Sequence, residues 1–285
     1  MTHVDLFTGI GGFALAASWV WREGHQPLLF CEIGSFPRKV LRKHWPHVPI
    51  HADIKTLNAD QLLGRVDLLT GGFPCQPYSV AGKGYGDLDD RALWREMVRV
   101  ARECRPRWIV GENVTRFLEM GFDAMRVALE GEGYEVWPVV LPACAVNAIH
   151  RRDRLWIIAH QIADASNSHC VRKLQPERLF PNIKRWADNG VEASAADSKR
   201  TGSDILDQRP GEGELWGSDP WNDGVQWPTE PPLCRADDGV SSGIYRDRAK
   251  RVGALGVSVV PTLVAEIFRG VQAVDYHRCT NQQTP

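Results

Sequence analysis

The chain has 285 residues, of which 43% are hydrophobic and 24% are charged, and its formal net charge is −1. This length allows one sizeable core with one inserted or appended lobe. No excess of lysine and arginine marks the whole chain as a nucleic-acid binder, so a DNA partner would have to be held by a local basic patch.

The seven cysteines are scattered, and no two of them form a C-x-x-C pair, which fits neither a disulfide framework nor a zinc site. Histidines 44, 47 and 51 lie close together, but prolines interrupt their spacing and no carboxylate or cysteine completes a ligand set. The first strand candidate begins at Val4, which leaves no room for a signal peptide, and no uninterrupted apolar run approaches about 18 residues. We therefore expect a cytoplasmic protein without a metal site or a membrane partner.

Strand-like and helix-like segments alternate up to about residue 160. The expected strands are Val4–Phe7, Leu28–Glu32, His51–Ile54, Val66–Thr70, Trp108–Gly111, Tyr134–Leu141 and Leu155–His160. The expected helices are Gly12–Arg22, Phe36–His44, Arg91–Cys104 and Met120–Glu132, with one helical turn at Asp60–Leu63. This alternation predicts an α/β fold, a parallel sheet with helices on both faces. The last two strands lack a connecting helix and predict an antiparallel hairpin at the edge of the sheet.

The composition changes after residue 160, so we divide the chain into residues 1–160, 161–253 and 254–285. Residues 161–253 have few periodic apolar runs and form either a functional lobe or a partly disordered segment. The acidic, Trp-rich part at 204–238 has no physical explanation from the sequence. Apolar character returns near the end, where Thr262–Phe268 reads as a helix that packs back on the first region.

A glycine-rich turn, Phe7-Thr8-Gly9-Ile10-Gly11-Gly12, joins the first strand to its helix. Glycines there let the backbone approach a ligand, or simply let helix and strand pack tightly. Glu32 ends the second strand about 20 residues later, where an acid commonly binds ribose hydroxyls, although a solvated carboxylate is the alternative. Asp53 could reach the base of the same nucleoside. The third spaced glycine of G-x-G-x-x-G is missing, which favours a compact nucleoside over a dinucleotide.

The segment Gly71–Ser79 presents Cys75 on a Gly/Pro-shaped loop directly after a buried strand. Such loops collect catalytic groups, whereas an isolated cysteine is usually a small buried hydrophobe. Glu112 follows the next strand, at the same edge of the sheet, and could exchange a proton with a substrate ring atom.

Arg152 and Arg154 alternate with Asp153 at the start of the last strand of the series, so we expect them to share one face of an extended segment. Paired guanidinium groups suit phosphate oxygens or a polar base edge. A solvated strand start with an Arg–Asp pair is the alternative.

Together these segments resemble the DNA (cytosine-5)-methyltransferase family. The resemblance is carried by five motifs in family order, which are Asp5–Phe13, Gly71–Ser79, Glu112–Val114, Arg151–Trp156 and Leu255–Pro261. It implies a Rossmann-like, S-adenosylmethionine-dependent methyltransferase sheet with a small irregular target-recognition lobe at 161–253. The implied substrate is double-stranded DNA and the implied product is 5-methylcytosine.

The resemblance also implies a role for each candidate residue. Cys75, as a thiolate, would add to C6 of a cytosine rotated out of the duplex, and C5 would then accept the methyl group. Glu112 would contact the N3 edge of the base, while Arg152 and Arg154 would hold its carbonyl and nearby groups. The implied cofactor contacts are Phe7, Gly9, Gly11, Gly12, Glu32, Asp53, Pro74 and Ser258.

Two departures from the family pattern keep other functions open. Val257 stands where the last motif carries Asn, and His150 stands where the arginine motif begins with Gln. The valine side chain cannot hydrogen-bond, so either packing there or contacts to the methionine end of the cofactor would be weaker. The alternatives are an RNA (tRNA) cytosine-5 methyltransferase, a catalytically impaired DNA-binding relative, and a nicotinamide-dependent oxidoreductase that the missing glycine disfavours. We expect a monomer, with a cognate restriction endonuclease as a candidate partner.

Overall fold

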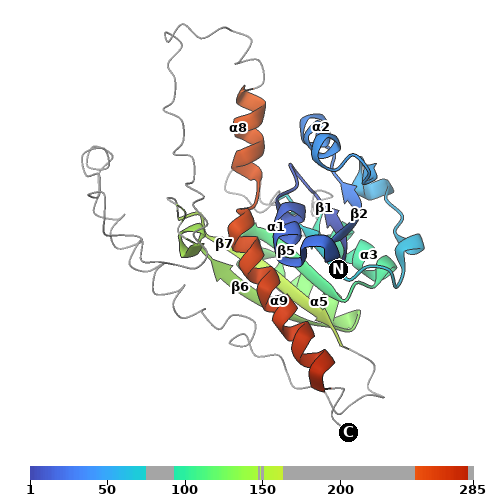
Figure 1. Ribbon diagram of the computed structural model, residues 1–285. Coiled ribbons are helices and arrows are strands. Elements are labelled where there is room, and N and C mark those ends of the chain that lie inside the picture. Colours follow the sequence, from blue (N-terminus) through green and yellow to red (C-terminus); the bar gives the residue numbers. More distant parts are fainter. Residues whose placement is uncertain (75–92, 147, 149–150, 163–247, 282–285) are drawn as a thin grey trace, which may run out of the picture.

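A seven-stranded sheet in the order β3-β2-β1-β4-β5-β7-β6 forms the centre of the computed structural model (Figure 1). The structure describes residues 1–74, 93–146, 148, 151–162 and 248–281. Its strands are β1 (Thr2–Leu6), β2 (Gln26–Cys31), β3 (Ile50–His51), β4 (Leu68–Gly71), β5 (Trp108–Val114), β6 (Tyr134–Leu141) and β7 (Arg154–Gln161).

The first five strands pair in parallel, whereas β7 is antiparallel to both β5 and β6. The predicted α/β fold with a mainly parallel sheet is therefore confirmed. The predicted hairpin at the edge is also present, but its second strand lies inside the sheet. Strand β7 pairs with β5 on its other side, so β6 forms the edge.

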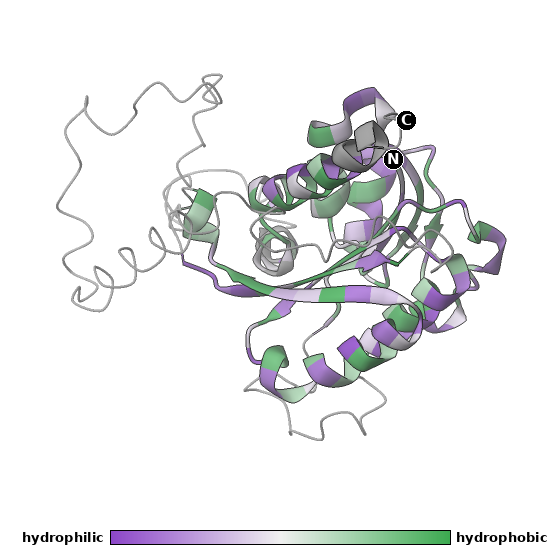
Figure 2. Ribbon diagram, turned by 90° about the horizontal axis from the view of Figure 1, so that it is seen from below, coloured by the Kyte–Doolittle hydropathy of each residue, from purple (hydrophilic) through white to green (hydrophobic). Residues whose placement is uncertain are grey.

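Helices cover both faces of the sheet, as Figure 2 shows from below. The helices are α1 (Gly12–Trp21), α2 (Ser35–His44), α3 (Trp94–Cys104), α4 (Phe117–Met120), α5 (Phe122–Gly131), α8 (Arg248–Val257) and α9 (Pro261–Asn281). Short 3₁₀ turns are η1 (Arg22–Gly24), η2 (Ile54–Thr56), η3 (Asp60–Leu62) and η5 (Ala143–Val146). Helices α3 and α5 share one apolar cluster with the sheet, and α1 and α9 share a second.

Strand β5 shows why the sequence of a central strand is apolar at consecutive positions. Ile109 packs in the cluster of α3 and α5, whereas Trp108 and Val110 pack in the cluster of α1 and α9. Successive side chains point to opposite faces of a strand, and here both faces are buried by helices. Apolar residues are therefore needed at consecutive positions.

Helix α9 brings the end of the described chain back onto the first helix. Phe268 contacts the ring of Trp21 with 5.1 Å between centroids, and Trp108 donates its indole N–H to Asp275 at 3.1 Å. The predicted helix at Thr262–Phe268 is confirmed and is longer than expected. Residues far apart in sequence thus share one core.

One stretch, Gly253–Asp275, is long and apolar enough by length and composition to cross a membrane. The stretch is not an uninterrupted apolar run, because Glu266 and Arg269 lie within it. Its second part lies in the core, because Leu263, Val264, Phe268 and Val271 are at most 2% exposed, whereas Leu255 in α8 is 65% exposed. A buried core helix passes the same test of length and composition, so packing against α1 and the sheet accounts for the apolar character of α9.

Most element boundaries differ from the predictions by a few residues, and three of these differences follow. Strand β5 continues through Val114, so Glu112 lies inside the strand and not after it. The helix predicted at Met120–Glu132 is two helices, α4 and α5, which meet at Gly121. Helix α3 begins at Trp94, and the predicted start at Arg91 lies outside the described residues.

Candidate active site

The carboxyl ends of the parallel strands meet in register at one edge of the sheet. Leu6 of β1 pairs with Cys31 of β2 and with Gly71 of β4, and Gly71 pairs in turn with Gly111 of β5. The glycine-rich turn, Glu32 and residues 72–74, which precede Cys75, follow these paired positions. This edge is where open α/β sheets bind ligands.

The turn after β1 has an unusual backbone. Phe7 has a φ of 51°, in the left-handed region that non-glycine residues rarely adopt, and Gly9 and Gly11 have φ values of 57° and 92°. Thr8 fixes this conformation, because its N–H donates to the Cys31 carbonyl at 3.1 Å and its hydroxyl donates to the Asp5 carbonyl at 2.7 Å. A held, strained turn of this kind is typical of a ligand-binding loop.

The three glycines of the turn do different things. A Cβ at Gly9 would meet no atom within 4 Å, so the space beside it is open. A Cβ at Gly11 would lie 2.6 Å from the Trp45 ring, and one at Gly12 would lie 2.7 Å from Val259. Close packing inside the protein thus explains Gly11 and Gly12, and Gly9 alone leaves room for a ligand.

The Glu32 carboxylate is oriented by two main-chain donors. Gly9 donates its N–H to one oxygen at 2.7 Å, and Gly34 donates to the other at 2.6 Å. Each carboxylate oxygen has a second lone pair, so Glu32 can still accept from hydroxyl groups of a ligand. The next residue, Ile33, is 74% exposed and offers an apolar surface beside it. The sequence prediction missed Ile33, which its position after the strand-end acid could have indicated.

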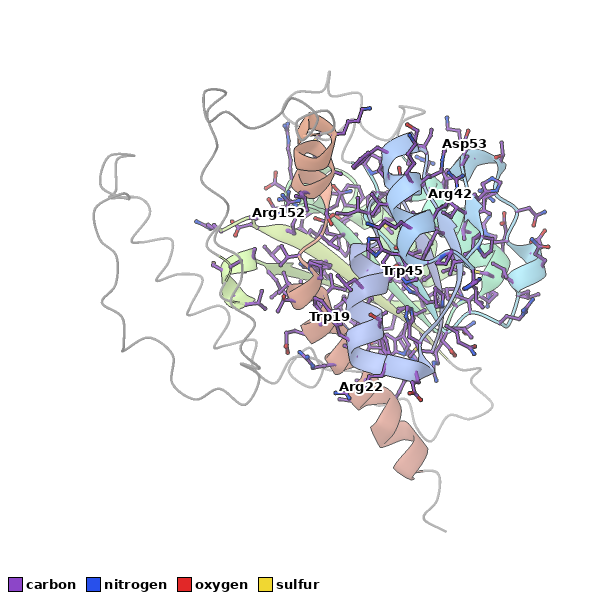
Figure 3. The ribbon with its side chains drawn as sticks, turned by 45° about the horizontal axis from the view of Figure 1, so that its top comes forward. Trp19, Arg22, Arg42, Trp45, Asp53 and Arg152 are labelled. Carbon is purple, nitrogen blue, oxygen red and sulfur yellow. The ribbon has the colours of Figure 1, made fainter. Side chains whose placement is uncertain are left out.

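Asp53 lies half-buried at the carboxyl end of β3 and accepts the Lys55 N–H at 3.0 Å. Figure 3 shows Asp53 and Trp45 on one side of the amino end of α1 and Arg152 on the other. Burial, and then the negative charges of Glu32, Asp53 and Asp5, raise the pKa of the Cys31 thiol to about 12. These three carboxylates make this end of the site electronegative.

A ligand for this end of the site can be described by its chemistry. Carboxylates accept hydrogen bonds from ribose hydroxyls or from a base amino group and attract a cation, and the open space at Gly9 leaves room for part of a ligand. A nucleoside with positive charge fits these residues.

The Glu112 side chain forms an ion pair at the neighbouring strand. Arg154 at the start of β7 donates from Nε to its carboxylate at 2.8 Å, and these side chains are 24% and 12% exposed. Burial raises the pKa of Glu112, while the positive charges of Arg154 and then Arg152 oppose that rise. A carboxyl group in this environment keeps a proton to higher pH than an exposed one.

Residues 72–74, which directly precede Cys75 in the sequence, lie beside Glu112 and Asn113. A Cβ at Gly72 would be 3.4 Å from a Glu112 carboxylate oxygen, and Asn113 donates its side-chain amide to the Phe73 carbonyl at 3.3 Å. Asn113 therefore ties the segment after β4 to β5, a role that sequence reasoning did not assign to it. Cys75 itself lies outside the described residues, and Pro74 is exposed at their limit.

Arg152 does not extend along the strand as predicted. It has a φ of 40°, so the segment is not extended there, and Arg152 and Arg154 take different partners. The guanidinium group of Arg152 donates to the carbonyls of Gly256 at 2.8 Å and Ser258 at 3.1 Å. An Arg–Asp pair, the alternative interpretation of this segment, is present between Arg151 and Asp153 at 2.9 Å.

The junction between α8 and α9 thereby reaches the site. Ser258 is half-buried, and its hydroxyl lies 3.2 Å from the position of a Cβ on Gly12. Arg152 thus connects the start of β7 to a segment that covers the amino end of α1. Val257, which departs from the family pattern, is the last residue of α8, and His150 lies outside the described residues.

A model of the C-5 cytosine-specific DNA methylase family matches residues 1–224. The Type II methyltransferase M.HgiCII of Herpetosiphon aurantiacus is 32% identical over 163 residues, which are 55% of this chain and 37% of that protein. The Type II methyltransferase M.Eco47II of Escherichia coli is 34% identical over 165 residues, which are 55% and 39% of the two chains. The Type II methyltransferase M1.ScrFI of Lactococcus lactis subsp. cremoris is 32% identical over 211 residues, which are 71% and 51%. This chain therefore matches between 37% and 51% of the length of these relatives.

Among solved structures, the Entamoeba histolytica methyltransferase EhMeth is similar with a TM-score of 0.50 at 17% identity. The likeness covers 57% of this chain and 53% of that one, and it concerns the fold alone.

Proposed function

The chain belongs to the C-5 cytosine-specific DNA methylase family, and from that premise we propose that it methylates C5 of cytosine in double-stranded DNA. The observation that carries the proposal is the Glu112–Arg154 ion pair beside residues 72–74, which precede Cys75. This pair adjoins the electronegative turn at Gly9 and Glu32, so one sheet edge offers a base site and a nucleoside site.

S-adenosylmethionine fits the electronegative end of the site and, when bound, supplies a methyl group on a positively charged sulfur. Glu32 would accept from its ribose hydroxyls and Asp53 from its adenine amino group. Phe7 and Ile33 would offer apolar surface to the adenine ring. The remaining proposed contacts are Gly9, Gly11, Gly12, Pro74 and Ser258, where Gly11 and Gly12 act through the shape of the turn.

The residues of β5 and β7 would act on the base. Cys75, as a thiolate, would add to C6 of a cytosine taken out of the duplex and would later be expelled when the C5 proton leaves. Glu112 would hold a proton at N3 while negative charge develops on the ring, a task that its raised pKa suits. Arg154 would keep that carboxyl oriented and face the base carbonyl.

Arg152 is better explained as a positioning residue than as a contact to the base. Its guanidinium group is committed to two main-chain carbonyls at the α8–α9 junction. It would therefore hold Ser258 against the amino end of α1, where the cofactor turn lies.

The larger setting follows the named relatives, which are Type II methyltransferases. Within this proposal, residues 1–160 carry catalysis, 161–253 select the target sequence and 254–285 pack back on the first region. The enzyme would work as a cytoplasmic monomer, with a cognate restriction endonuclease as its partner in the cell.

The proposal is tested by methyl-label transfer from S-adenosylmethionine to duplex DNA, followed by analysis of the modified base. We expect 5-methylcytosine with the native chain and with the control Cys144→Ser, and none with Cys75→Ala. Transfer to tRNA in place of DNA would establish the RNA alternative. Cofactor-independent DNA binding without transfer would establish a non-catalytic relative.

A further inference from the structure

Four polar side chains form a continuous chain beneath the turn after β1. His25 Nε2 lies 3.0 Å from His3 Nδ1, and His3 Nε2 lies 2.7 Å from the Thr70 hydroxyl. Thr70 donates to Asp5 Oδ1 at 2.6 Å. The chain thus crosses the sheet from the start of β2, past the start of β1, to the carboxyl ends of β1 and β4.

The inner members of this chain are shielded from water. His3, Asp5 and Thr70 are each 0% exposed, and only His25 is half-buried. Thr70 lies on the same face of β4 as Leu68, which packs in the cluster of α1 and α9. Buried polar groups are rare without a partner, yet Asp5 Oδ2 has none among the described residues.

When Asp5 is ionised, the hydrogen bonds of the chain can point in only one direction. The Thr70 hydroxyl then donates its hydrogen bond to Asp5. His3 must therefore donate from Nε2 to Thr70 and accept at Nδ1 from His25. Every donor then points inward, toward the carboxylate.

The charged groups around the chain favour a change of protonation near neutrality. Burial raises the pKa of Asp5 to about 7, the hydrogen bond from Thr70 opposes that rise, and the charge of Glu32 adds to it. Burial, and then its neighbour His25, hold the pKa of His3 well below its usual range. Burial and the nearby amino group of Met1 lower the pKa of His25 to about 4, so both histidines are neutral when Asp5 titrates.

We propose that His25, His3 and Thr70 form a proton relay that sets the charge of Asp5 beneath the cofactor turn. Uptake of one proton at His25 Nδ1 moves the Nε2 proton of His25 to His3 Nδ1. The Nε2 proton of His3 then passes to Thr70, whose own proton passes to Asp5 Oδ1. One proton enters and one reaches Asp5, both histidines stay neutral, and each changes tautomer.

The change of charge that the relay brings to Asp5 makes cofactor binding depend on pH, an inference that rests on the proposed function. Asp5 lies near Glu32, which the Gly9 N–H contacts, so an ionised Asp5 adds negative charge to the site. Its protonation below neutrality removes that charge. The affinity for a positively charged cofactor therefore rises as the pH rises through about 7.

The binding test is calorimetric titration of the full chain with S-adenosylmethionine and with S-adenosylhomocysteine, whose sulfur is uncharged, between pH 6 and pH 8.5. We expect the affinity for S-adenosylmethionine to rise about tenfold over this range, and the affinity for S-adenosylhomocysteine to rise less. No binding of either ligand at pH 8.5 would overturn the proposed function. Binding with equal pH dependence for both ligands, or with none, would overturn the relay alone.

Three variants assign the effect to the chain. Asp5→Asn removes the charge, so its affinity should stay low and flat across the range. Thr70→Val removes the donor that stabilises ionised Asp5 and should move the midpoint upward by about one pH unit, whereas Thr70→Ser should restore it. The matched control is His47→Gln, an exposed histidine outside the chain, which should keep the native midpoint.

Nitrogen NMR of the histidine rings gives a readout that a purely structural role would not move. His3 should change from the Nε2–H to the Nδ1–H tautomer as the pH falls, with the midpoint of the binding curve, and should keep one tautomer in Asp5→Asn. A fixed His3 tautomer in the native chain would overturn the relay. So would a Thr70→Val variant that melts at a lower temperature but keeps the native binding midpoint.

Discussion

The two halves of the sheet edge differ in the partners of their carboxylates. At the ends of β1, β2 and β3, the carboxylates of Asp5, Glu32 and Asp53 are held by main-chain N–H groups or a hydroxyl, with no ion pair among the described residues. At β5 and β7, Glu112 is paired with Arg154. The first half offers carboxylates without ion-pair partners and suits a cation, while the second, in the proposed function, would orient a polar but uncharged base.

Replacing Glu112 should have the largest effect of the changes proposed here. It should lower the rate of methylation and leave cofactor affinity nearly unchanged. In Glu112→Gln the side chain keeps an oxygen for Arg154 but cannot hold an acidic proton, so single-turnover methylation should fall roughly 10²- to 10⁴-fold. The affinity for S-adenosylmethionine, measured by calorimetry, should stay within about twofold of native. The exposed Glu130→Gln is the control, and a variant with native methylation rates would remove Glu112 from the mechanism.

Replacing Glu32 tests the first half in the same way. Glu32→Ala removes the proposed ribose acceptors and leaves the Gly9 and Gly34 N–H groups without their partner. Affinity for S-adenosylmethionine should fall about 10- to 100-fold, with a smaller change in the rate at saturating cofactor. Glu23→Ala, an exposed glutamate after α1, serves as control. An unchanged affinity would contradict the cofactor assignment.

The glycine turn offers a sharper contrast within the first half. In Gly12→Ala the added Cβ would lie 2.7 Å from Val259, so the free energy of unfolding should fall by about 1–2 kcal/mol. In Gly9→Ala the space is open, and the strained φ should destabilise the chain by about 1 kcal/mol or less while cofactor affinity falls. Denaturant unfolding and calorimetry measure the two quantities, and equal stability losses would refute the different roles of these glycines.

Arg152 should give the smallest effect, because it acts through the main chain. Arg152→Lys keeps one donor to the α8–α9 junction and loses the second, so the affinity for S-adenosylmethionine should fall about threefold. Arg151→Lys is the adjacent control. If cofactor affinity stayed native while the rate at saturating cofactor fell, Arg152 would be a contact to the base, as the sequence predicted.

The sequence predicted most elements of the described fold, because buried strands and amphipathic helices leave strong local patterns. It ended β5 too early, since Glu112 and Asn113 interrupt the apolar run although they continue the strand. It also gave Arg152 the wrong local geometry. The partners of Arg152 lie at 256 and 258, and no local pattern carries such a contact. For the same reason, the sequence did not predict the contact of Asn113 with Phe73. It also did not predict the hydrogen-bonded chain from His25 to Asp5, whose members are brought together by strand pairing.

Bisulfite sequencing of DNA from cells that express the chain tests the central claim most directly. We predict methylated cytosines within a recurring sequence in cells with the native chain, and none above background with Cys75→Ala. Cytosines that remain unmodified in both, while the native chain is folded and binds S-adenosylmethionine, would contradict the claim that this site methylates DNA.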